Sequence, residues 1–478
     1  MLALPETLKS VYLKITLSRF TVAFFLFAFI HSFAEGFIQA FIFSQDAYAN
    51  NIVTSILREA QVPRANFGIL HRAHGNATLS LCNEIPTYIS EKPCALVYET
   101  GRNNLTDPSF TTTAVNVSVP LGDGSSKQIS SMCALVLTYP HQVLANAQRE
   151  DVVLLLTQFW IFSVSFFAIV YDSIPHLVAA LCFRTLATGW SMYIIWRTGD
   201  VRERFEILLH SNDSPCRFEV DQLFPSYFAS RSALQIPDLA LNVIALLLAL
   251  YLSRKLIKIY GLNTFNRVGA PPEIIRVYKY FLGVFVSFQL SALLLISAVA
   301  LWLDQIVNPN NAFSQMTIHK TLYIGISVTT LALLVPWIAM GWYSVRREWK
   351  KLMFAFLFIA ALVFTSWILM LKSWTFAWTF VEWPFFACSI IAASLSLLAT
   401  IVFGVISLLH FDKGLAHYLY VDDVLAKAGF EPELFEKDVE KNAGSDWRDI
   451  GLDDVPTYTL SFSTEKRDLG DAEKADMK

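Results

Sequence analysis

The sequence predicts an all-α multi-pass membrane protein with eight transmembrane helices and a small β-rich domain between the first two. Composition carries the first half of this prediction. Of 478 residues, 54% are hydrophobic and only 16% are charged, whereas a soluble globular chain carries about 25% charged residues. The mean hydropathy is +0.46. The net charge is −3, and no basic, aromatic-interleaved stripe indicates nucleic-acid binding.

Eight apolar stretches carry the rest of the prediction, because a transmembrane helix needs about 20 mainly apolar residues. They cover residues 21–43, 151–171, 174–196, 237–257, 280–303, 320–344, 352–371 and 386–409. The third is the least apolar, since Arg184 lies near its middle. The first stretch predicts a lone transmembrane helix, and the other seven predict a bundle within residues 151–410.

The charged connections predict the orientation of these helices. Lysine and arginine are concentrated in residues 1–20, in 254–279 and in SVRREWKK (344–351). The positive-inside rule places all three segments in the cytosol, and eight crossings make these placements mutually consistent. Both chain ends are then cytosolic, and residues 44–150 and 197–236 face the outside or a lumen.

Glycosylation sequons and cysteines agree with that orientation. Four sequons outside the spans fall on the predicted outer side, at Asn76, Asn104, Asn116 and Asn212. Four of the six cysteines fall there too, namely Cys82, Cys94, Cys133 and Cys216. In an oxidising compartment they predict two disulfides with three possible pairings, although free buried thiols are the alternative.

The outer segment 46–150 is long enough for a small domain. Its start, NIVTSILREAQV, predicts a short amphipathic helix, and HQVLANAQRE (141–150) predicts a helical approach to the second span. Between them, turn clusters separate four β-like runs at 77–82, 95–100, 114–121 and 129–139. At the other end of the chain, residues 411–478 are acidic and lack periodicity, which predicts a disordered cytosolic tail.

Three intramembrane residues form the candidate polar cluster, which comprises His31, Glu35 and Arg184. His31 and Glu35 are four residues apart and share a helix face. A charge at bilayer depth is costly, so we expect Glu35 to pair with Arg184. The pair is either a structural clamp or the lining of a polar pathway. A further alternative is that the first stretch is a cleaved signal ending at Ala49.

Motifs for known chemistry are missing from the sequence. It has no HExxH, Walker A loop, GxSxG elbow, Rossmann glycine pattern or EF-hand loop. HRAH (71–74) has the spacing HxxH but no supporting histidine cluster. We therefore predict that the protein is not an enzyme and carries no cofactor or metal.

The second half of the chain contains residues 236–282, LWLDQ (301–305), KTLY (320–323), PWIAMGWYSVRRE (336–348) and FAWTFVEW (376–383). These segments carry a resemblance to a family of multi-pass membrane proteins of basidiomycete fungi. It implies a fungal source and supports the span count, and it brings no catalytic residue. The order of one span, an outer domain and seven spans is also similar to the layout of Wntless and Golgi-dynamics-domain seven-span proteins, which escort secreted cargo.

These observations predict a non-enzymatic protein of the plasma membrane or secretory pathway. It would act as a receptor, cargo escort or scaffold that binds a secreted or cell-surface protein through residues 46–150. The alternative is a transporter or channel that uses His31, Glu35 and Arg184.

Overall fold

The computed structural model describes most of the chain. The described residues are 6–73, 76–85, 94–101, 117–120, 126–217, 219–268, 272–309 and 311–413, together with 421 and 424. Residues Met1–Glu431 form one compact unit. The predicted disordered tail at 411–478 lies almost wholly outside the described residues.

Eight helices of the described chain are long and apolar enough to cross a membrane, which confirms the predicted span count. They are α2 (Arg19–Glu59), α4 (Thr138–Val170), α5 (Ile174–His210), α7 (Tyr227–Val268), α8 (Pro272–Val307), α10 (Lys320–Arg346), α11 (Lys350–Met370) and α13 (Pro384–Leu409). Five shorter helices are α1 (Glu6–Thr16), α3 (Ser131–Val136), α6 (Val220–Leu223), α9 (Ala312–Met316) and α12 (Trp374–Glu382).

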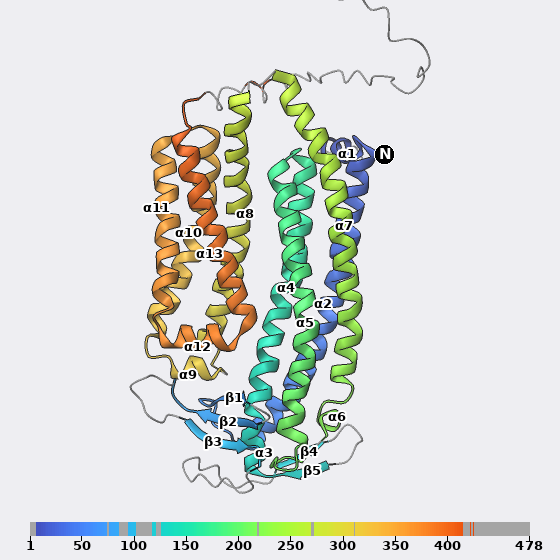
Figure 1. Cartoon of the computed structure of the whole chain (residues 1–478), viewed down its shortest axis with the longest axis vertical. Helices are drawn as coiled ribbons and strands as arrows, with labels where there is room; N and C mark the ends of the chain where they lie inside the picture. The colour runs from blue at the N-terminus through green and yellow to red at the C-terminus, as the bar shows by residue number, and fades with distance from the viewer. Residues whose placement is uncertain are drawn as a thin grey trace, which may run out of the picture. The chain divides into compact units, whose positions relative to one another are not determined.

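The long helices pack as two groups of four (Figure 1). The first group contains α2, α4, α5 and α7, and the second contains α8, α10, α11 and α13; α5 and α8 join them. Aromatic side chains fill the second group, where Trp302, Trp337, Phe356 and Phe386 are buried together. The indole of Trp337 stacks on Phe356, with ring centroids 4.9 Å apart.

The two ends of the bundle differ as the charge pattern predicts. Helix α1, the end of α7, the start of α8 and the basic connection between α10 and α11 lie at one end, and the sheet lies at the other with α9 and α12 (Figure 1). Helix α2 has 41 residues, roughly 60 Å at 1.5 Å per residue. This is about twice the ~30 Å hydrocarbon thickness, so α2 continues beyond the membrane at the end that carries the sheet.

The small domain is built on a three-stranded antiparallel sheet in the order β1 (Phe67–Ala73), β2 (Asn76–Cys82) and β3 (Cys94–Glu99). A separate hairpin pairs β4 (Val117–Pro120) with β5 (Ser126–Ile129). Phe67 of β1 lies 5.2 Å from the ring of Phe313 in α9, between ring centroids. Burial raises the pKa of Glu382 in α12, against the opposing effects of His71 in β1 and Arg204.

Two disulfides hold this end together. Cys82 is bonded to Cys94 across β2 and β3, and Cys133 of α3 is bonded to Cys216 after α5. The prediction of two disulfides is confirmed, and the structure selects one of the three pairings. The second bond joins segments that are 83 residues apart, so the domain is tied directly to the helical bundle.

The predicted strands are partly confirmed. The runs at 77–82 and 95–100 correspond to β2 and β3, and the run at 114–121 contains β4. The strand predicted at 129–139 is wrong, because this segment forms α3 and the start of α4. The Ser130 hydroxyl accepts a hydrogen bond from the Cys133 amide at 3.2 Å, which caps the helix start. Strand β1 was not predicted. The helix expected in NIVTSILREAQV is the last part of α2.

One prediction on packing concerns Gly341, where α10 meets α11. A Cβ at Gly341 would lie 2.7 Å from the Phe356 ring, which Trp337 holds by stacking. We expect Gly341→Ala to lower the free energy of unfolding by about 1–3 kcal/mol, as overpacked sites do. Gly325→Ala on the same helix is the control, since nothing lies within 4 Å of that position. Thermal unfolding of both purified variants tests this; equal melting temperatures would contradict it.

Candidate functional site

Among the described residues, the buried acidic, basic and histidine side chains belong to the first helix group. Among the described residues of α8, α10, α11 and α13, none of the buried side chains is acidic, basic or histidine. The buried side chains of those kinds in the described chain are His31, Glu35, Asp46, Glu150, Asp151, Arg184, Arg231 and Asp238. They come from α2, α4, α5 and α7. The two groups therefore have different cores, one polar and one apolar.

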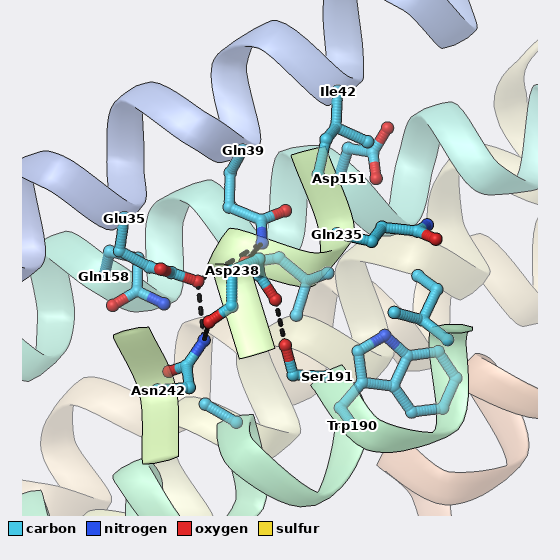
Figure 2. A pocket seen from close by; sticks show the side chains of 13 residues that line it. Glu35, Gln39, Ile42, Asp151, Gln158, Trp190, Ser191, Gln235, Asp238 and Asn242 are labelled. Carbon is cyan, nitrogen blue, oxygen red and sulfur yellow. Dashed lines mark hydrogen bonds between the residues drawn. The ribbon is translucent and has the colours of Figure 1, made fainter. Parts of the chain in front are cut away.

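Glu35 and Asp238 form the centre of this polar core (Figure 2). Asn242 donates from Nδ2 to Glu35 Oε1 at 2.7 Å, and Gln39 donates from Nε2 to Asp238 Oδ1 at 2.7 Å. The Gln39 amide also reaches Glu35 Oε1 at 3.5 Å. Ser191 donates its hydroxyl to Asp238. The two carboxyl groups thus share one set of donors from three helices.

Arg184 does not form the expected ion pair with Glu35, so that expectation is wrong. Its guanidinium lies 4.8 Å above the Phe27 ring, and Nη1 donates to His31 Nδ1 at 2.8 Å. A guanidinium only donates, so His31 is the acceptor and its imidazole is neutral. The structure therefore keeps the three predicted residues in one cluster but pairs them differently.

Adjacent carboxyl groups distinguish this core from an ordinary clamp. Glu35 lies beside Asp238, because the Gln39 amide reaches both carboxyl groups. Glu35 Oε2 and both Asp151 oxygens receive no hydrogen bond from any donor in the described part of the chain. Two ionised carboxylates in contact repel each other, so such a pair holds a proton or a cation between its members.

A small cavity lies beside these carboxyl groups. Its volume is about 20 Å³, which is enough for one water-sized species. Its polar lining comprises Glu35, Gln39, Asp151, Gln158, Ser191, Gln235, Asp238 and Asn242 (Figure 2). Gln158 and Gln235 are almost fully buried, and neither Gln158 Oε1 nor Gln235 Nε2 has a hydrogen-bond partner among the described residues.

Two buried ion pairs lie beyond the cavity, nearer the sheet. Arg231 is paired with Asp46, which also accepts a hydrogen bond from the Tyr227 hydroxyl at 2.8 Å. Arg197 is paired with Glu150 at 2.6 Å. Arg197, Tyr227 and Arg231 line a second cavity of about 20 Å³, and Ile194 lies on the wall of both cavities. Polar groups therefore continue from the centre of the bundle toward the sheet.

The predicted glycosylation sites and the HRAH segment lie outside the polar core or outside the described residues. Asn76 and Asn212 are exposed at the end of the bundle that carries the sheet, whereas Asn104 and Asn116 lie outside the described residues. Glycosylation at all four stays a prediction. His71 belongs to β1, and His74 lies outside the described residues. No group of three or more His, Cys, Asp or Glu that could hold a metal ion occurs in the described chain.

Sequence reasoning missed Gln39, Ser191, Asp238 and Asn242. It treated Asp238 as the edge of the fourth span, but α7 begins eleven residues earlier, at Tyr227, and Asp238 is buried. The sequence does contain a pattern that could have identified them: EGFIQ (35–39) and DLALN (238–242) each place an amide side chain four residues after an acidic one. That spacing aligns acid and amide on one helix face.

No protein-family model, no curated protein and no solved structure matches this chain. The resemblance to basidiomycete membrane proteins and the layout shared with Wntless and Golgi-dynamics-domain proteins stay predictions.

Proposed function

We propose that this chain is an ion-coupled membrane transporter whose working ion, a proton or a small monovalent cation, is bound by Glu35 and Asp238. The charge balance of the polar core is the observation that supports this. Among the described residues, the buried carboxyl groups of Glu35, Asp46, Glu150, Asp151 and Asp238 are accompanied by three guanidinium groups. These belong to the buried Arg184 and Arg231 and to Arg197, which pairs with Glu150. Two carboxyl groups therefore lack a compensating charge. A buried charge without a partner is strongly unfavourable, so protons or cations supply the missing charge.

A purely structural clamp accounts for less of this arrangement. A clamp needs matched charges, as in the Asp46–Arg231 pair. The Glu35–Asp238 centre instead has a carboxylate oxygen without a donor among the described residues, next to a cavity that can hold a small species. Ionisable residues at membrane depth commonly belong to ion pathways or proton relays. These features favour the transporter alternative over a fixed role.

Binding of a secreted or surface protein through residues 46–150 remains a separate prediction. Parts of this segment, at 86–93, 102–116 and 121–125, lie outside the described residues. Crosslinking of the full chain in intact membranes, followed by identification of its partners, would test that prediction. A specific partner bound through this segment would support a receptor, escort or scaffold role beside ion coupling.

Flux measurements on the purified protein in lipid vesicles test the transporter proposal. We expect vesicles under a potassium diffusion potential to take up protons, measured with trapped pyranine, or radioactive Na⁺, measured by filtration, faster than empty vesicles. Glu35→Gln combined with Asp238→Asn removes both carboxyl groups and should reduce this flux at least tenfold. The exposed Glu206→Gln, from the Arg202–Glu206 pair, is the control. Flux equal to that of empty vesicles for both ions, or flux unchanged by the double substitution, would contradict the proposal.

A further inference from the structure

We infer that the cavity beside Glu35 and Asp238 binds one dehydrated Na⁺ ion, with Gln158 as a ligand. This rests on the proposed function, because it names the ion of the same site. Gln158 of α4 lines the cavity, and its side chain is 3% exposed (Figure 2). Its Oε1 atom has no hydrogen-bond partner in the described part of the chain. A buried amide oxygen without a donor is unfavourable, and a cation in the cavity would satisfy it.

The lining chemistry suits a hard cation. Glu35 Oε2 and the Asp151 carboxylate also receive no hydrogen bond from a described donor, so oxygen acceptors outnumber free donors around the cavity. A proton can satisfy one pair of oxygens, whereas a cation is coordinated by several at once. Carboxylate and amide oxygens are the ligands that hard cations prefer.

The size of the cavity restricts the ion. A volume of about 20 Å³ holds one water-sized species, so a cation with its full hydration shell does not fit. The bound ion must exchange water for protein oxygens, and the smaller alkali cations match this space better than larger ones. We therefore expect Na⁺ to bind in preference to K⁺.

The ligand demands of divalent cations favour a monovalent one. Ca²⁺ takes six to eight oxygen ligands and Mg²⁺ keeps several of its waters, and a cavity of about 20 Å³ does not hold them. Asp46 does not line the cavity and is already held by Arg231 and Tyr227, so it is not a ligand. One Na⁺ beside Glu35 and Asp238 supplies one of the missing positive charges.

Thermal unfolding of the full chain in detergent tests the site without any transport assay. Melting temperatures are measured while NaCl replaces KCl, or N-methylglucamine chloride, at constant ionic strength. A ligand that binds only the folded state raises stability with its concentration. We expect a saturable rise in Na⁺ that K⁺ does not reproduce. Equal melting temperatures in all three salts would overturn the site.

Substitution of Gln158 tests the assignment of the ligand. We expect Gln158→Leu and Glu35→Gln each to raise the apparent Kd for Na⁺ at least tenfold. Gln289→Leu is the matched control, because Gln289 is a buried glutamine in α8, outside the first helix group. The Gln289→Leu variant should bind Na⁺ with the same apparent Kd as the wild type. An unchanged apparent Kd for Na⁺ in Gln158→Leu would show that Gln158 is not a ligand. If a variant fails to fold, the wild-type salt series still decides whether Na⁺ binds.

The two proposals can fail separately. Proton flux in vesicles without a Na⁺-specific rise in melting temperature would overturn the Na⁺ site and leave ion coupling supported. Na⁺ binding without flux of either ion would support the site and overturn the transporter proposal.

Discussion

Arg231→Met is expected to lower the free energy of unfolding by about 3–5 kcal/mol, which is the typical cost of breaking a buried ion pair from one side. Arg231 is almost fully buried, and Asp46 is 0% exposed. Methionine preserves much of the side-chain volume but leaves the Asp46 carboxylate with only the Tyr227 hydroxyl as a described donor.

Denaturant unfolding in mixed micelles measures this effect. Arg202→Met is the control, because the Arg202–Glu206 pair is half exposed and such surface pairs contribute about 0–1 kcal/mol. Adding Asp46→Asn to Arg231→Met removes the unpaired charge and should recover part of the lost stability. A loss of similar size in Arg202→Met, or no recovery in the double variant, would show that the buried pair does not stabilise the bundle as argued.

Replacing Cys133 and Cys216 by serine is the second large change, with an expected loss of about 4.5 kcal/mol from the loop-entropy relation. The bond closes a loop with a sequence separation of 83 residues. It joins α3 to the segment after α5, inside a core that also holds Val53, Leu79 and Phe205. Its loss therefore frees the small domain from the bundle in the unfolded ensemble.

The second disulfide supplies the matched control. Cys82 and Cys94 are separated by 12 residues, and the same relation gives about 2.8 kcal/mol for their replacement by serine. Thermal unfolding of both double-serine variants at equal protein concentration compares the two losses. A larger loss for Cys82–Cys94 than for Cys133–Cys216 would contradict the role assigned to the longer loop.

The membrane helices were predictable because membrane insertion depends on local composition. A window of about 20 apolar residues is sufficient to cross a bilayer, wherever the rest of the chain lies. The ends of the helices were not predictable in this way. Helices α2 and α5 continue to Glu59 and His210, because their last turns pack against the small domain rather than against lipid.

The small domain was harder to predict, because its segments are short and their sequences are compatible with either a helix or a strand. ISSMCALVLTY contains a short continuous apolar run that fits a buried strand or a buried helix, yet the Ser130 cap and burial of Cys133, Ala134, Leu135 and Val136 make it helical. Strand β1 contains His71 and Arg72, so it lacks a continuous apolar pattern. Its pairing with β2, from Phe67 opposite Cys82 to Ala73 opposite Asn76, supplies the stabilisation that its own sequence lacks.

The sequence by itself determined the class of the protein, the eight spans, the charge difference between the two ends and the presence of ionisable residues at membrane depth at His31, Glu35 and Arg184. All of these follow from the free energy of transferring a single segment between water and lipid. Only the tertiary structure decided which groups these residues meet. Asp238 meets Gln39 across 199 residues, and Asn242 meets Glu35 across 207. Local patterns contain no information on contacts at such separations, because helix packing alone determines which buried faces meet.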